Sequence, residues 1–124
     1  MTMNYAGKPI VKGVLFMSSM KCQENVEQMA MQIKVQCARH NILVEDVAVE
    51  HNPIGDMDID RPSVKSLVNT VANGDYEVLV LRNLYDVTED EADWEQFLNI
   101  MADMEIQVYV TETGEFVCNN YEEC

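Results

Sequence analysis

Three groups of polar residues come directly after apolar runs and could carry chemistry. They are Ser18-Ser19-Met20, His51-Asn52 and Arg82-Asn83-Leu84-Tyr85-Asp86. Ligands of open α/β sheets bind at the carboxyl ends of the strands, so these groups are the predicted site positions. A serine there could act as a nucleophile, although a serine that ends a strand is more commonly a cap or turn residue.

These positions argue against two classes of α/β protein that bind phosphate groups. The loop after the first apolar run contains no glycine, whereas a dinucleotide fold or a P-loop needs a glycine-rich loop there. A phospho-receiver domain is similar in length and alternation. It needs an acidic cluster after its first strand and an aspartate at the end of its third, where this chain has serines and Arg82. Neither class is expected.

The spacing of potential ligands indicates no metal site and no cofactor. Asp56-Met-Asp-Ile-Asp60 is similar to the start of a calcium loop, but Arg61 stands where glycine belongs and Leu67 where glutamate belongs. The four cysteines match no zinc-binding pattern, because no pair has the required spacing. We expect them to be reduced thiols, one of them in the core; they are Cys22, Cys37, Cys118 and Cys124.

Strand and helix patterns alternate along the chain and would position these groups. Short apolar runs predict strands at 12–18, 42–49, 77–81 and 106–110, with a turn at 113–114 leading into 115–118. Helical periodicity predicts helices over 23–40 and from Pro62 to about residue 74, separated from the second strand by a polar loop at 51–60. A third helix is predicted up to about residue 104, with Thr88 as its N-cap and Glu91 completing a capping box. The fold class is therefore α/β: three layers, with a mostly parallel four- to five-stranded sheet flanked by helices.

Charge is distributed unevenly and argues against DNA binding by this domain alone. The net charge is −14; residues 1–40 have a balance of +3, and residues 41–124 a balance of −17. Proteins hold DNA mainly through lysine and arginine, which displace counterions from the phosphates. The acidic two-thirds would repel a phosphate backbone, although an acidic surface commonly serves only solubility.

Length and composition fit one intracellular domain. With 124 residues, 48% of them apolar, the chain is expected to form a single domain with a substantial core. Residues 1–12 lack the apolar core of a secretory signal, and no stretch approaches the roughly 20 apolar residues of a membrane helix. A cytoplasmic location without membrane contact is expected.

Several motifs occur in an order that resembles a known family. The first is Leu15-Phe-Met-Ser-Ser19-Met-Lys-Cys-Gln23 before a helix, and the second is Ile54-Gly55 followed by Asp60-Arg61-Pro62. The third is Asn73-Gly74-Asp75-Tyr76 leading into an apolar strand, and the fourth is the stretch from Leu84 to Asp90. Together they resemble the catalytic domain of serine recombinases, the resolvase/invertase family, over about residues 12–112. The domain is taken as 1–124, and the family's dimerisation helix and DNA-binding domain have no counterpart in it.

The resemblance implies DNA strand exchange, in which a serine attacks a DNA phosphate and arginines stabilise the transition state. Ser19 matches the nucleophile, Gln23 its partner on the helix, and Arg61 one of the arginines. Four positions depart from the family: Met17 replaces an arginine, and Tyr85, Asp86 and Glu89 stand in the family's Asp-Arg-Leu-Ser-Arg stretch, so that two cations become anions. A phosphoryl transition state needs those cations because it spreads negative charge over its oxygens.

We therefore expect a catalytically inactive, recombinase-like domain that acts as a regulatory or interaction module. Its expected partners are recombinase-like subunits, in a homo- or hetero-oligomer, and its own DNA binding should be weak or absent. The alternative is an active or repurposed recombinase or phosphoesterase that uses Ser19 with cations from elsewhere. A magnesium or manganese ion held by Asp58, Asp86 or Glu89 could supply that charge, but no spacing here is diagnostic.

Overall fold

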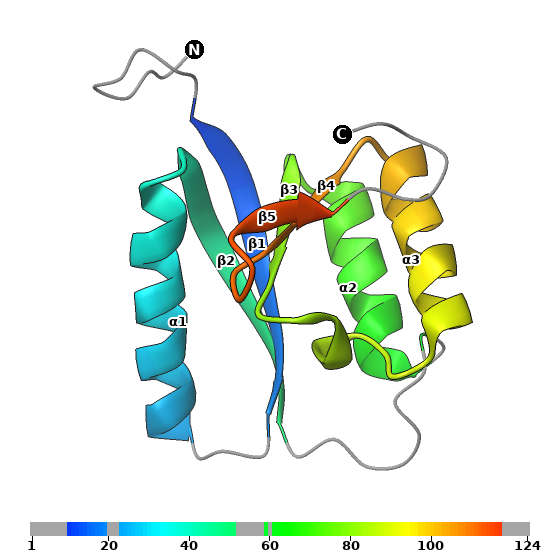
Figure 1. Cartoon of the computed structure of the whole chain (residues 1–124), viewed down its shortest axis with the longest axis horizontal. Coiled ribbons are helices and arrows are strands. Elements are labelled where there is room, and N and C mark those ends of the chain that lie inside the picture. Colours follow the sequence, from blue (N-terminus) through cyan, green and yellow to red (C-terminus); the bar gives the residue numbers. More distant parts are fainter. Residues whose placement is uncertain (1–9, 20–22, 52–58, 60, 118–124) are drawn as a thin grey trace.

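Five strands form one sheet in a computed structural model that describes residues 10–19, 23–51, 59 and 61–117 (Figure 1). The sheet order is β2-β1-β3-β4-β5. Neighbouring strands are parallel except β4 and β5, which are antiparallel. The elements in chain order are β1 (Val11–Ser19), α1 (Gln23–Ala38), β2 (Ile42–His51), α2 (Pro62–Asn73), β3 (Val78–Leu81), the 3₁₀ turn η1 (Leu84–Asp86), α3 (Glu91–Asp103), β4 (Gln107–Val110) and β5 (Glu115–Val117). The predicted mostly parallel α/β sheet is confirmed; most of the loop predicted at 51–60 lies outside the described residues.

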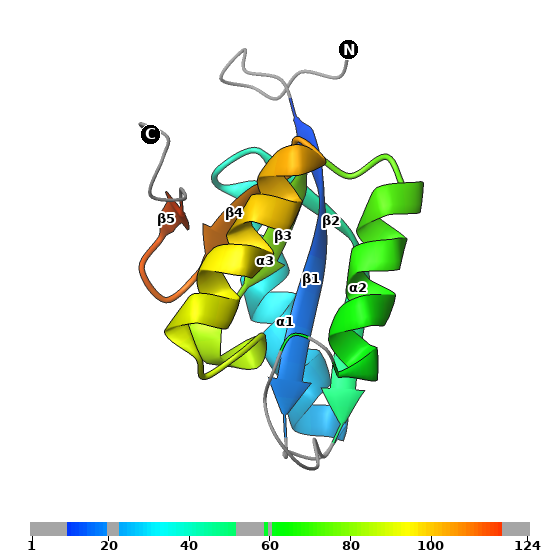
Figure 2. The same cartoon turned by 90° about the vertical axis from the view of Figure 1, so that its right-hand side faces the viewer.

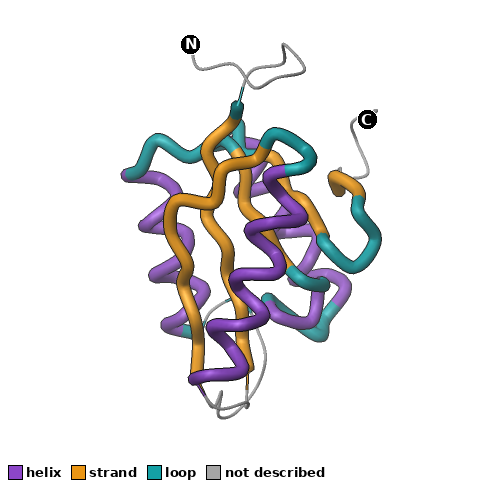
Figure 3. Tube along the Cα trace, turned by 90° about the vertical axis from the view of Figure 1, so that its left-hand side faces the viewer, coloured by secondary structure: helices purple, strands orange, loops and turns teal. Residues whose placement is uncertain are grey.

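Helices cover both faces of the sheet, because the apolar strands alternate their side chains between two cores. In β1, Leu15 and Met17 face α1, while Val14 and Phe16 face α2 and α3. Helix α1 lies in front of the sheet in Figure 3, and α2 and α3 lie in front of it in Figure 2. This three-layer arrangement leaves the two ends of the sheet as the places where loops can form a site.

The start of α3 differs from the sequence prediction. Asp90, not Thr88, is the N-cap: its carboxylate accepts hydrogen bonds from the backbone N–H groups of Ala92 and Asp93, at 2.8 and 3.3 Å. Thr88 is buried, and its hydroxyl oxygen accepts from the N–H of Asp90 at 3.1 Å. The predicted capping box is therefore wrong, since Thr88 belongs to the packed segment that follows η1.

The first helix ends close to its predicted stop. Helix α1 ends at Ala38, and Asn41 has a left-handed φ of 65° before β2 begins. Cys37, in the last turn of α1, is buried and unpaired, and burial raises the pKa of its thiol to about 11. This thiol stays protonated, as expected for a core cysteine; Cys22, Cys118 and Cys124 lie outside the described residues. No helix in the described ranges is long and apolar enough to cross a membrane.

Candidate functional site

The strand order creates a topological switch point between β1 and β3 at the carboxyl end of the sheet. After β1 the chain runs to β2 on one side, and after β3 it runs to β4 on the other. The crevice between β1 and β3 is thus a topological switch point, where α/β sheets commonly bind ligands. Ser18 and Ser19 end β1, and Arg82 follows β3, so the predicted site residues do gather here.

An acidic residue from the neighbouring strand meets Ser18 at this edge. The parallel register pairs Ser18 with Glu50 of β2. The Ser18 hydroxyl donates a hydrogen bond to Glu50 Oε1 at 2.7 Å. The Nε of Arg61 lies 3.2 Å from both Glu50 carboxylate oxygens, forming an ion pair. Glu50 therefore neutralises the arginine that the resemblance assigns to the phosphate.

The rest of the Arg61 guanidinium also points into the protein. Arg61 immediately precedes α2, and only 8% of it is exposed. Its terminal nitrogens donate to the backbone carbonyls of Asp86, at 2.6 Å, and of Val87. Arg61 thus connects the end of β2 and the start of α2 to the last residue of η1 and the residue that follows it. This is a structural role. The acidic residues that precede Arg61 in the sequence, Asp58 and Asp60, lie outside the described residues.

A second arginine bridges the crevice itself. Arg82 and Asp86 form a bidentate ion pair, with Nε to Oδ2 at 2.9 Å and a terminal nitrogen to Oδ1 at 2.7 Å. The same terminal nitrogen donates to the Ser18 carbonyl at 2.8 Å, across the gap between β3 and β1. Arg82 therefore links the end of β3 to the end of β1 at the switch point.

The ion pairs shift the pKa of one member of each pair, Arg82 and Glu50. Hydrogen bonds from Arg82 to Asp86 are the largest influence on Arg82 and raise its pKa; burial lowers the pKa, and the charges of Asp86 and Glu112 raise it further. Burial of the Glu50 carboxylate would raise its pKa, but hydrogen bonds from Ser63, Ser18 and Arg61, with the Arg61 charge, hold the pKa below the usual 4.5. Two cations face two anions, so the edge offers little net positive charge to a phosphate.

The residues carried by the resemblance have different places in the structure. Ser19 is the last residue of β1, opposite His51, and Gln23 begins α1; the side chains of both lie outside the described part of the chain. Met17, which replaces an arginine, is fully buried in the core under α1. Tyr85 is 68% exposed and Glu89 is also exposed, so neither belongs to the network of hydrogen bonds around Arg61 and Arg82.

Two members of the network were not identified as partners from the sequence. Glu50 fell just beyond the predicted end of the second strand, where a charged residue after alternating apolar ones is a weak signal of a site. Asp86 was identified only as a departure and as a metal-ligand candidate, whereas both its carboxylate oxygens bind Arg82. The described ranges contain no group of three or more His, Cys, Asp or Glu side chains that could hold a metal ion.

The sheet order and the layers are those of serine recombinase catalytic domains, so the chain has their fold. It superimposes on the N-terminal catalytic domain of TP901-1 integrase with a TM-score of 0.67 and 11% identity, covering 85% of this chain and 80% of that one. The C-terminal catalytic domain of ISC1926 TnpA, an IS607-like serine recombinase, gives 0.66 and 13%, covering 82% and 70%. A resolvase family site-specific recombinase from Streptococcus pneumoniae gives 0.69 and 14%, covering 91% and 78%.

These likenesses confirm, at the level of fold, the resemblance predicted from the sequence. No protein-family model matches the sequence, and no curated protein is significantly similar to it.

The depressed pKa of Glu50 predicts a pH dependence of stability. A carboxyl whose pKa is lower in the folded state stabilises the fold above its unfolded pKa, and this contribution is lost as the pH falls through the folded value. The difference in unfolding free energy between the native chain and Glu50→Gln should therefore shrink as the pH falls below about 4.5. Urea unfolding from pH 7 downward measures it. Glu45→Gln, which removes a more exposed carboxylate of β2, should show little change; a constant Glu50 difference would contradict the role of this carboxylate.

Proposed function

We propose that this chain is a recombinase-like domain without strand-exchange activity, acting as a regulatory or interaction module in DNA recombination. The observation that carries the proposal is the engagement of Arg61 and Arg82 by Glu50 and Asp86. An arginine that already forms ion pairs and donates to backbone carbonyls inside the fold must break those bonds before it can bind a phosphate. The shared fold supports a relationship to recombinases, and the pairing of both arginines with carboxylates supports the lack of activity.

The magnitude of the missing charge supports the proposal. Removing a single donor that stabilises transition-state charge typically costs about 10²–10³ in rate. Here Met17 is an apolar core residue where the resemblance places an arginine, and Asp86 and Glu89 carry negative charge where it places cations. Three such losses, two of them with reversed charge, leave too little electrostatic stabilisation for useful phosphoryl transfer at Ser19.

The rival function, an active recombinase or phosphoesterase with a compensating metal ion, has less support. It needs a group of free carboxylates, but the Asp86 carboxylate is bound by Arg82 and the Glu50 carboxylate by Ser18 and Arg61. Glu89 is exposed and lies outside this network. Asp58 lies outside the described residues. The inactive module, located in the cytoplasm with recombinase-like subunits as partners, is therefore the function that we adopt.

The proposal predicts that the isolated chain does not bind duplex DNA measurably at physiological salt. Non-specific binders reach dissociation constants of roughly 10⁻⁴–10⁻⁶ M through clustered lysine and arginine. Residues 41–124 instead carry a balance of −17, and the two arginines at the edge are paired with carboxylates. Fluorescence anisotropy with a labelled duplex of roughly 30 base pairs, at low and moderate salt, measures this. Micromolar binding that weakens steeply with salt would contradict the proposal.

A further inference from the structure

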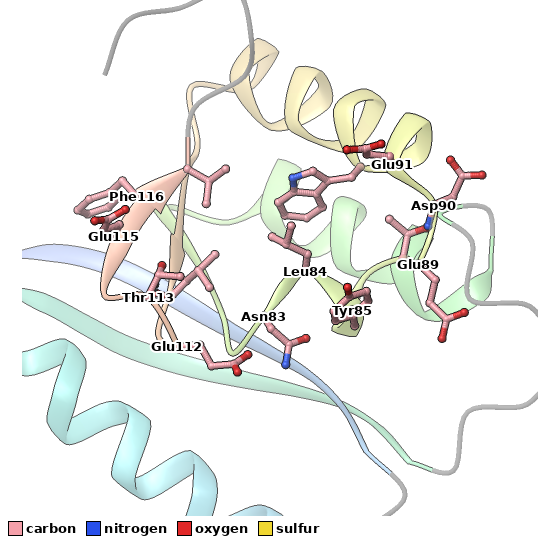
Figure 4. A pocket seen from close by; sticks show the side chains of 14 residues that line it. Asn83, Leu84, Tyr85, Glu89, Asp90, Glu91, Glu112, Thr113, Glu115 and Phe116 are labelled. Atoms are coloured by element: carbon pink, nitrogen blue, oxygen red, sulfur yellow. Dashed lines mark hydrogen bonds between the residues drawn. The ribbon is translucent and has the colours of Figure 1, made fainter.

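A hollow lies between the β4–β5 hairpin on one side and η1 with the start of α3 on the other (Figure 4). It is distinct from the ion pairs of Arg61 and Arg82. Its volume is about 710 Å³, within the range of pockets that bind ligands. Although these ion pairs do not use the hollow, Glu89, one of the departures from the family, lies on its rim.

The hollow has an apolar surface formed by large side chains. Leu84 is 37% exposed and Tyr85 is 68% exposed, and the buried Trp94 of α3 also lines the hollow. Two of the six large apolar side chains that are exposed in the described ranges thus border one hollow. Clustered exposed apolar surface of this kind is typical of interaction sites, because covering it removes it from water.

The rim of the hollow is acidic. Glu89, Asp90 and Glu91 lie on the side of α3, and Glu112 and Glu115 lie on the side of the hairpin (Figure 4). Among the described residues that line the hollow there is no lysine, arginine or histidine. Asp90 caps α3, but within the described part of the chain no ion pair is formed by the four glutamates. A cationic occupant would gain from all of them.

From these features we propose that the hollow is a docking site for a basic, partly apolar peptide segment of a partner protein. Arginine or lysine side chains pair with the glutamate rim, and apolar side chains cover Leu84 and Tyr85. A second copy of this chain is disfavoured, since each copy carries a net charge of −14. The inference deepens the proposed function by assigning the interaction surface and the chemistry of its partner, and so rests on that function.

Titration of labelled peptides with the full chain tests the docking site. The probe is a peptide of about 18 residues with arginine on one helical face and leucine on the other. Two further peptides replace arginine by glutamate, or leucine by serine. Anisotropy should rise with the first peptide, weaken with added salt, and stay low with the other two. Equal binding of the leucine and serine peptides would overturn the apolar part of the proposal, and no binding of the first peptide at low salt would overturn it entirely.

Matched charge variants locate the site. Glu89→Gln, Glu91→Gln and Glu115→Gln together should weaken the affinity for the first peptide roughly tenfold, because each exposed ion pair contributes modestly. The control makes the same charge change at the opposite end of the sheet with Asp75→Asn, Glu77→Gln and Asp103→Asn, and should change the affinity less than about twofold. Equal effects of the two sets would overturn the assignment of the hollow.

A third variant and a sedimentation measurement complete the test. Tyr85→Ser changes an exposed side chain and should weaken the peptide complex while leaving thermal unfolding unchanged; unaltered affinity would count against the site. A concentration-dependent dimer that the triple glutamate variant abolishes would make a second copy the occupant and overturn the proposal. All these measurements are independent of DNA cleavage, so activity at Ser19 would refute the proposed inactivity and leave the docking site standing.

Discussion

Replacing Arg61 by methionine is expected to lower the free energy of unfolding by about 3–5 kcal/mol. The substitution keeps an apolar stem but removes a guanidinium that is only 8% exposed and that pairs with Glu50. It leaves the Glu50 carboxylate without its cation and the carbonyls of Asp86 and Val87 without their donor. Breaking one side of a buried ion pair is costly for this reason, and urea unfolding at pH 7 measures the loss.

The control for Arg61 lies one turn along the same helix. Lys65 is exposed on α2, and Lys65→Met should change the unfolding free energy by less than about 0.5 kcal/mol. If Arg61→Met cost no more than Lys65→Met, Arg61 would not be a structural anchor. Its guanidinium would then be free to serve a phosphate, contrary to the proposed function.

Replacing Asp86 by asparagine should destabilise the chain by about 2 kcal/mol, since hydrogen bonds to charged groups contribute roughly 1.5–3 kcal/mol. Asp86 is 4% exposed, and the change removes the carboxylate that holds both the Nε and a terminal nitrogen of Arg82. The loss is smaller than for Arg61, because the Arg82 side chain is 23% exposed and water can replace part of the pairing. Thermal and urea unfolding measure it.

The control for Asp86 is Asp103→Asn, which makes the same chemical change on an exposed residue at the end of α3 and should be nearly neutral. A neutral effect of Asp86→Asn would mean that the pair with Arg82 contributes nothing to the fold. Arg82 would then be available to a ligand at the end of β3, contrary to the proposed function.

Much of the fold could be predicted because its signals are local. Continuous apolar runs marked the buried parallel strands, and helical periodicity marked the helices between them. The N-cap of α3 was predicted incorrectly because Thr88 and Asp90 are both good capping residues, two positions apart. Which of them caps the helix depends on the packing of Thr88 behind η1, a contact that local sequence does not encode.

The site was predicted only in outline because its contacts join distant parts of the chain. The resemblance located Arg61 and Asp86, but treated the first as a phosphate contact and the second as a lost cation. Their partners depend on the register that puts Glu50 beside Ser18, and on the turn that brings Asp86 back to Arg82. Both are tertiary features. Each of the two arginines at this end of the sheet is neutralised by a carboxylate within the fold.

The most direct test asks whether Ser19 forms a covalent bond with DNA. The full chain and Ser19→Ala are incubated with supercoiled plasmid and quenched in denaturant, and the protein is digested and analysed by mass spectrometry for a nucleotide linked to residue 19. We predict no linked nucleotide in either protein, because the Arg61 and Arg82 charges are paired with Glu50 and Asp86. A nucleotide on Ser19 of the native chain that is absent from Ser19→Ala would contradict the proposed inactivity.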